Sequence, residues 1–208
     1  MIELGRQGGP MLGLILLVGM AAAAIFLERL YYLHRAQIRW RDFLLGLINI
    51  LKRQNIAEAV SICEETPGPV AQLARAAILH HDEGPVRIRR AIEETGLVEM
   101  PRLESRLPLL ATLAHLAPLL GLLGTVLGLM RMLLTIQQKA PLVHAGDLSA
   151  GLWQALLATA AGLAVSIPAY AGYNLLLARV ASVSLDMERA AMELENYFAQ
   201  NTPASGAV

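Results

Sequence analysis

Three uncharged polar side chains could do chemistry in the apolar second half of this 208-residue chain. Thr125 and Thr159 each lie in a row of small residues, and Gln154 lies about 40° around a helix from Ala158, at the edge of the second row. Hydroxyl and amide groups order water and pass hydrogen bonds, but they do not titrate near neutral pH. The candidates for an ion pathway are therefore Thr125, Thr159 and Gln154.

Two of the polar residues near these rows have alternative interpretations. Arg131 lies at the edge of the first row, near its far end, where its charge could guard the outer entrance of an ion pathway or simply reach the polar interface. Gln154 could belong to the pathway or clasp two helices, because an amide in hydrocarbon needs a partner. His115 points away from the first row, near the opposite end, and we expect a structural role for it.

The small residues themselves have helical spacing. Glycines and one threonine recur at i, i+3, i+4 and i+7 in the first row, and the second row repeats the arrangement from Gly151 onward. A glycine costs roughly 1 kcal/mol against alanine inside a soluble helix, whereas membrane helices use small faces to approach each other closely. We therefore expect helix packing through these residues: Gly121, Gly124, Gly128, Ala155, Ala158, Gly162 and Ser166. In that packing, the threonine hydroxyls either bond their own backbone or line a wet pathway.

The composition indicates a membrane protein. Hydrophobic residues make up 55% of the chain and charged residues 16%, and the mean hydropathy is +0.49, which is too apolar for a soluble domain. About 20 apolar residues cross a bilayer as a helix, so we predict transmembrane helices over residues 10–32, 107–136 and 148–177. The first stretch could instead be a cleaved signal peptide with its site near residues 21–24, but the apolar run continues and basic residues follow it.

The polar segments complete a predicted topology. Fourteen of the seventeen Lys and Arg residues lie in residues 28–106 or after residue 177, which places those segments in the cytoplasm and the amino terminus outside. The expected fold is an all-α membrane protein with three extended transmembrane helices. Its other parts are a periplasmic tail (1–9), a cytoplasmic helical domain (33–106), a periplasmic loop (137–147) and a cytoplasmic tail (178–208). Within the domain we expect helices around residues 44–51, 70–80 and 86–94, with a break at residues 66–69, a turn at residues 82–85 and a stop at Gly96.

Enzyme chemistry is not indicated. The spacing Gly121-x-x-Gly124 follows no strand pattern and lacks a phosphate-loop lysine. Cys63 is the single cysteine, so it forms no intrachain disulfide and is expected to be buried. Neighbouring His80 and His81 point in different directions from a turn, which favours a solvated surface over a metal site. We expect no catalytic residue, metal or cofactor, and no nucleic-acid partner.

Two motifs resemble the MotA/TolQ/ExbB proton-channel family, in its ExbB/TolQ branch. The run APLLGLLGTVLG over residues 117–128 is similar to the family's second span. The segment ALLATA at residues 155–160, with IPA at 167–169 and Tyr173-Asn174, is similar to its third span. Weaker likeness lies at residues 28–30 and 68–71, so the resemblance extends over most of the chain.

The resemblance implies a mechanism and partners. It implies a homopentamer in the inner membrane that encloses the single transmembrane helices of an ExbD/TolR-like protein. Protons would pass Thr125, Thr159 and an aspartate of that partner, and the movement would be transmitted to a TonB- or TolA-like protein. Gln154 departs from this pattern, because the family carries glutamate there.

Two functions therefore remain open. One is a proton-conducting energiser; the alternative is a non-conducting membrane scaffold in which the small faces serve only to assemble partner helices.

Overall fold

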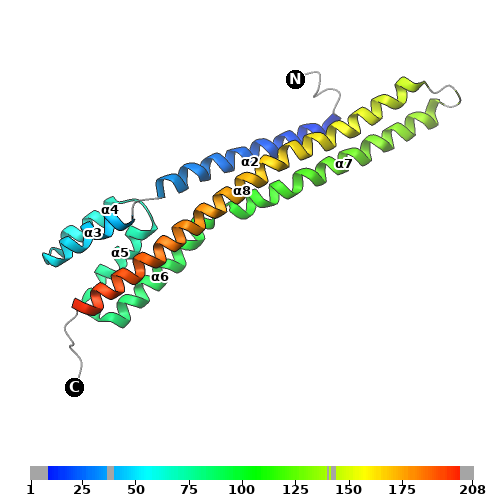
Figure 1. Cartoon of the computed structure of the whole chain (residues 1–208). Helices are drawn as coiled ribbons and strands as arrows, with labels where there is room; N and C mark the ends of the chain where they lie inside the picture. Colours follow the sequence, from blue (N-terminus) through cyan, green and yellow to red (C-terminus); the bar gives the residue numbers. More distant parts are fainter. Residues whose placement is uncertain (1–8, 37–39, 140, 142–143, 202–208) are drawn as a thin grey trace. The chain divides into compact units, whose positions relative to one another are not determined.

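The computed structural model describes residues 9–36, 40–139, 141 and 144–201, and every regular element among them is a helix (Figure 1). Three stretches are long and apolar enough to cross a membrane: Pro10–His34, Pro85–Lys139 and Leu148–Gln200. The helices are α2 (Gly9–Ala36), α3 (Trp40–Lys52), α4 (Ile56–Glu65), α5 (Pro69–Leu79), the 3-10 turn η1 (His81–Glu83), α6 (Pro85–Glu104), α7 (Leu107–Lys139) and α8 (Ala145–Asn201).

The chain divides into two compact units. The first comprises Met1–Arg29 and Arg106–Leu175, and the second comprises Leu30–Ser105 and Leu176–Val208. The long helices α2 and α8 are each divided between the two units, α2 after Arg29 and α8 after Leu175.

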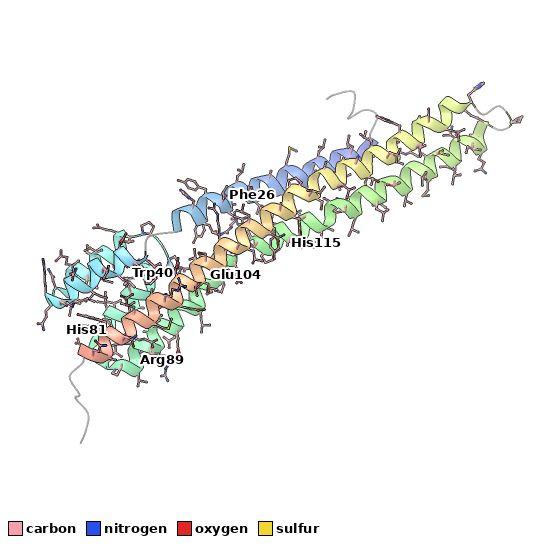
Figure 2. All side chains as sticks on the ribbon, in the orientation of Figure 1. Phe26, Trp40, His81, Arg89, Glu104 and His115 are labelled. Atoms are coloured by element: carbon pink, nitrogen blue, oxygen red, sulfur yellow. The ribbon has the colours of Figure 1, made fainter. Side chains whose placement is uncertain are left out.

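The first unit is a bundle of α2, α7 and the first part of α8. Helices α7 and α8 run antiparallel, since Gly128 lies against Ala155 and Gly121 lies against Gly162. Helices α2 and α8 run parallel, with Gly19 against Val165 and, further along both helices, the ring of Phe26 against Gly172 (Figure 2). Many leucines on the outside of these helices are exposed, as expected for surfaces that face lipid.

The second unit consists of α3 to α6 and the last part of α8. On α8, buried residues from Leu176 to Leu194 alternate at spacings of four and three, which is the seven-residue repeat of helices that pack along their whole length. The sequence prediction described this segment as a polar, helix-compatible tail and did not identify the repeat. Its residues are Leu176, Val180, Val183, Met187, Ala190 and Leu194, and Phe198 is buried four residues later.

The predicted helix breaks in this unit are partly right. Gly68 and Gly84 have positive φ values of 128° and 89°, and each is followed by a proline at the start of the next helix. The predicted stop at Gly96 is wrong, because α6 continues from Pro85 to Glu104. The glycine's propensity cost of about 1 kcal/mol is offset by the buried face that the helix keeps on both sides of it, at Ile92 and Leu103.

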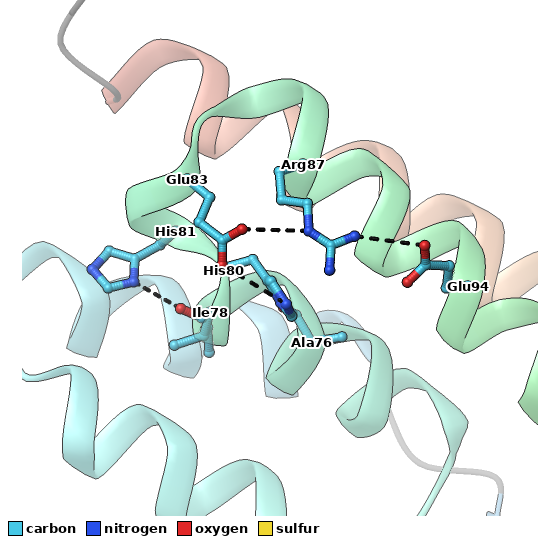
Figure 3. A network of polar contacts seen from close by, with 7 residues as sticks. All are labelled: Ala76, Ile78, His80, His81, Glu83, Arg87 and Glu94. Atoms are coloured by element: carbon cyan, nitrogen blue, oxygen red, sulfur yellow. Dashed lines mark hydrogen bonds and ion pairs between the residues drawn. The ribbon is translucent and has the colours of Figure 1, made fainter.

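Polar contacts hold the turn between α5 and α6. Nδ1 of His80 donates to the carbonyl oxygen of Ala76 at 2.9 Å, and Nδ1 of His81 donates to that of Ile78 at 2.8 Å (Figure 3). Arg87 lies between two carboxylates, 3.4 Å from Glu83 and 3.5 Å from Glu94. The two histidines therefore close the end of α5, each through its own backbone bond.

No metal-binding cluster occurs among the residues that the structure describes, since no three His, Cys, Asp or Glu side chains converge there. Cys63 is fully buried in the second unit, as predicted, and burial raises the pKa of its thiol to about 11.

Candidate functional site

The first unit brings the two rows of small residues face to face. Gly121, Gly124 and Gly128 are buried on α7, and Ala155 and Ala158 are buried on α8. A Cβ atom added at Gly124 would lie 2.5 Å from the Cβ of Ala158, and one added at Gly128 would lie 2.9 Å from the Cβ of Ala155. These distances are too short for two carbon atoms, so the approach of α7 and α8 requires glycine at both positions.

At two further positions the glycines lie directly against the backbone of the opposite helix. A Cβ atom at Gly162 would lie 2.7 Å from the carbonyl oxygen of Ala117, and one at Gly121 would lie 3.0 Å from that of Ala158. Ser166 adds a hydrogen bond across the same pair, because its Oγ donates to the carbonyl oxygen of Ala114 at 2.9 Å. All seven residues expected to pack helices thus lie between α7 and α8.

Thr125 and Thr159 meet in the middle of this contact. Their hydroxyl groups hydrogen-bond to each other across the two helices, and both side chains are half-buried. The Thr125 Oγ1 lies 3.0 Å from the carbonyl oxygen of Gly121, and the Thr159 Oγ1 lies 3.5 Å from the same oxygen. Two hydroxyl protons serve these three contacts, so one proton joins the two threonines and the other is donated to Gly121.

Gln154 and Arg131 form a second polar contact nearer the ends of the helices. Arg131 Nη1 on α7 donates to Gln154 Oε1 on α8 at 3.1 Å. Sequence spacing placed each residue at the edge of its own row but did not pair them, because the register between two helices is not encoded in either one alone. The contact corresponds to the clasp interpretation of Gln154 and gives Arg131 a protein partner.

A cavity of about 750 Å³ opens beside this contact. It lies between the end of α7 and the beginning of α8, and it was not anticipated from the sequence. Its lining contains the Arg131–Gln154 pair, two hydroxyl residues and one indole: the residues are Arg131, Met132, Thr135, Ser149, Ala150, Gly151, Trp153 and Gln154.

His115 lies outside the small-residue row, on the exposed flank of α7 (Figure 2). Its Nδ1 donates to the carbonyl oxygen of Ala111 at 2.7 Å, and its ring meets that of Tyr170 edge-on with centroids 5.7 Å apart. These contacts give His115 partners away from the threonine pair.

Titratable carboxylates are missing from the uncharged core of the predicted spans. Residues 10–27, 107–136 and 148–177 contain no Asp or Glu, and Glu28 is the single acidic residue within the bounds of the first span. A described ion pair of the first unit joins Glu28 of α2 to Arg106, just before α7. The two spans that carry the threonine pair therefore hold no acidic group to exchange a proton with it.

The comparisons with known proteins agree with the two spans. The model of the MotA/TolQ/ExbB proton channel family matches residues 65–189, which is more than half of the chain. A putative biopolymer transport protein, ExbB-like 3, from Synechocystis is 29% identical over 159 residues, covering 76% of this chain and 74% of that protein.

Two further relatives match a shorter region. The biopolymer transport protein ExbB of Aquifex aeolicus is 44% identical over 86 residues, covering 41% of this chain and 57% of that protein. The Tol-Pal system protein TolQ of Haemophilus influenzae is 40% identical over 96 residues, covering 42% of this chain and 38% of that protein. With three membrane-length apolar helices, the chain is a multi-pass membrane protein. It belongs to the MotA/TolQ/ExbB proton channel family, in the ExbB/TolQ branch.

Proposed function

We propose that this protein is the inner-membrane channel subunit of an energiser that couples the proton motive force to work in the periplasm. Its family supports a role in proton-driven transport. In the proposed complex, five copies enclose the single-span helices of an ExbD/TolR-like protein, and the movement is passed to a TonB- or TolA-like protein. Residues 33–106 and the carboxyl terminus lie in the cytoplasm, and the amino terminus lies in the periplasm.

The observation that carries this proposal is the hydroxyl pair of Thr125 and Thr159. Both hydroxyls lie within the α7–α8 contact, and both threonines are half-buried. A hydroxyl donates and accepts at once, so the pair can order water and hand on a hydrogen bond without itself changing charge. Such a pair suits a proton path, but only if another group takes up and releases the proton.

The proton-carrying group is proposed to come from the partner. A carboxylate in a membrane interior is costly enough to mark a functional site, and residues 10–27, 107–136 and 148–177 of this chain hold none. Arg131 keeps its proton, and Gln154 has none to exchange. The single-span partner therefore supplies the carboxylate, positioned beside Thr125 and Thr159.

A non-conducting scaffold is the second candidate, and one observation favours it. The threonine hydroxyls are already satisfied by each other and by Gly121, as ordinary interhelical hydrogen bonds would be. In that case the two rows of small residues serve only to assemble helices.

Proton flux into liposomes separates the two functions. The purified protein is reconstituted with and without a single-span partner that carries one carboxylate, and a trapped pH-sensitive dye reports flux under an imposed gradient. We expect flux only with the partner. Thr125→Val or Thr159→Val should lower that flux by about tenfold, the effect of losing a hydrogen bond worth about 1.4 kcal/mol.

Thr112→Val is the matched control, because Thr112 is an exposed residue of α7 whose hydroxyl donates a hydrogen bond to the carbonyl oxygen of Pro108. This variant should conduct like the unmodified protein. Fast flux from the purified single protein, abolished by Thr159→Val, would overturn the need for a partner carboxylate. A partner that binds without any flux would favour the scaffold.

A further inference from the structure

The cavity at the end of the α7–α8 pair has the chemistry of an anion site. Among the described residues that line it, Arg131 is the only one with a formal charge. Its guanidinium donates one hydrogen bond to the neutral Oε1 of Gln154, which leaves the positive charge without a described carboxylate. A guanidinium has five N–H donors, so most of them remain for a ligand.

The neighbouring hydroxyls do not compete for that role. Thr135 Oγ1 donates to the carbonyl oxygen of Arg131 at 2.9 Å, and Ser149 Oγ donates to that of Gly146 at 2.9 Å. Trp153 also lines the cavity, and its side chain is 55% exposed. Besides the amide of Gln154, the donors that the described lining offers are therefore the guanidinium of Arg131 and the indole N–H of Trp153.

The depth of Arg131 identifies the kind of anion. Arg131 lies 24 residues after Leu107, where α7 begins, which is about 36 Å along the helix axis. The hydrocarbon core of a bilayer is about 30 Å thick, so a helix that enters at its beginning brings Arg131 to the opposite headgroup layer. Exposed tryptophan is typical of the same layer. Phosphate groups of lipids are the anions concentrated at that depth.

We propose that this cavity binds the headgroup of an anionic phospholipid such as phosphatidylglycerol, with its phosphate on Arg131 and Trp153 beside it. A zwitterionic choline lipid carries a cation next to its phosphate, so it fits less well beside the positive charge of Arg131. The proposal requires α7 to cross the membrane, but it does not depend on proton conduction. It can therefore fail or succeed independently of the proposed function.

Tryptophan fluorescence offers a direct test, because the chain has only two tryptophans. Trp40→Phe leaves Trp153 as the sole emitter, and bromine atoms on nearby lipid chains quench it. The protein is reconstituted in vesicles in which either phosphatidylglycerol or phosphatidylcholine carries the bromine. We expect about fivefold preference for phosphatidylglycerol, the ratio for a basic residue worth about 1 kcal/mol at an anionic surface.

Three variants locate the preference. Arg131→Gln should abolish it by removing the charge. Gln154→Glu should abolish it too, because the new carboxylate pairs with Arg131 in place of the phosphate. Lys139→Gln removes a cation from the end of the same helix but not from the cavity lining, so it should retain the preference.

Three results would overturn the proposal. Equal quenching by both brominated lipids, with the cavity residues unchanged, would mean that no headgroup is selected. If Lys139→Gln lost the preference as fully as Arg131→Gln does, the preference would come from a general surface potential and not from the cavity. Millimolar inorganic phosphate forms the last arm. Relief of the phosphatidylglycerol quenching by phosphate alone would make this a site for free anions and not for lipid, whereas no relief supports the lipid.

Discussion

Single polar residues in the α7–α8 pair are satisfied by the opposite helix. Thr125 bonds Thr159, Ser166 bonds the backbone at Ala114, and Arg131 bonds Gln154. An unpaired polar group in hydrocarbon costs several kcal/mol, so these contacts also fix the register of the two helices. Thr125 and Thr159, the two threonines proposed for the proton path, are thus also part of the packing between α7 and α8.

Cys63 lends itself to a prediction about pH. Burial holds the pKa of its thiol at about 11, so the protein keeps the thiol protonated at pH 8. Two pKa units above the reference value of 9.0 lower the thiolate fraction by about 100-fold. Alkylation by iodoacetamide, followed by mass spectrometry, should be correspondingly slow and should rise about tenfold per pH unit until pH 11.

The control for this measurement is an exposed thiol on the same helix. Ser61→Cys in a Cys63→Ala background places a cysteine at an exposed position of α4. Its alkylation should level off above about pH 9, as for an unperturbed thiol. Equal rates for the two thiols at pH 8 would contradict the burial of Cys63.

Gln54 tests backbone strain at a turn. It follows α3 with φ of 57°, a left-handed conformation that costs a side-chain-bearing residue about 1 kcal/mol. Its side chain is exposed. Gln54→Gly should therefore raise the free energy of unfolding of the detergent-solubilised protein by up to about 1 kcal/mol, and with it the melting temperature. Gln54→Val should lower both, because a β-branched residue fits this conformation least. A lower melting temperature for Gln54→Gly would contradict the strain.

Residue types and spacing predicted part of the site. Helical periodicity alone placed Thr125 and Thr159 in rows of small residues, because a helix fixes which of its own residues share a face. It could not pair Arg131 with Gln154 or reveal the cavity beside them. Those features depend on how far one helix slides along the other, which is decided by packing over the whole pair.

At the scale of helices, close approach is the feature that the glycines determine. A Cβ atom added at Gly124 would meet the methyl group of Ala158, and one added at Gly162 would meet the backbone of Ala117. Neither an alanine methyl group nor the backbone can turn aside as a flexible side chain can. A larger residue at either position must therefore push the two helices apart and separate the threonine hydroxyls.

Gly124→Leu and Gly162→Leu should each destabilise the first unit by about 2 kcal/mol or more, because overpacking at these contacts has no side chain to absorb it. Native mass spectrometry of the detergent-solubilised protein should show loss of its oligomer. Gly13→Leu is the matched control, since an added Cβ there has no atom within 4 Å and the residue is exposed. Intact oligomers from both α7–α8 variants would refute the packing argument, and Leu123→Ile should be tolerated.

Helix boundaries were predicted best where backbone chemistry decides them. The Gly68-Pro69 and Gly84-Pro85 pairs end and begin helices as expected, because glycine takes the positive φ and proline fits the first turn. Gly96 misled the prediction because tertiary packing outweighed its propensity. The segment that continues α8 to Asn201 was predicted only as a helix-compatible tail, because its repeat is apolar on the buried side alone and the segment looks polar on average.

At the scale of the whole chain, the distribution of charge determines the proposed topology. Basic residues resist transfer across the membrane, and they concentrate in residues 28–106 and after residue 177. The lengths of the helices agree with three crossings, since each membrane-length stretch has at least 25 residues. An odd number of crossings places the two termini on opposite sides.

Cysteine labelling in intact cells checks this arrangement. In a Cys63→Ala background, Val86→Cys introduces a thiol at a position that is 77% exposed at the start of α6, and Gln138→Cys introduces one at the exposed end of α7. A membrane-impermeant maleimide should label the second thiol from the periplasm and leave the first unlabelled. The first should react only after the inner membrane is permeabilised, which also shows that its thiol is accessible.

The two sites together make the outcome decisive. If the chain is inverted, Val86→Cys reacts in intact cells and Gln138→Cys does not, and the proposed topology is wrong. Labelling of both in intact cells would mean that α7 does not cross the membrane, which would also remove the depth argument for the phospholipid site at Arg131. Labelling of Gln138→Cys alone agrees with both the proposed topology and the phospholipid site. Arg131 then lies seven residues before a thiol on the periplasmic side, about 10 Å along α7.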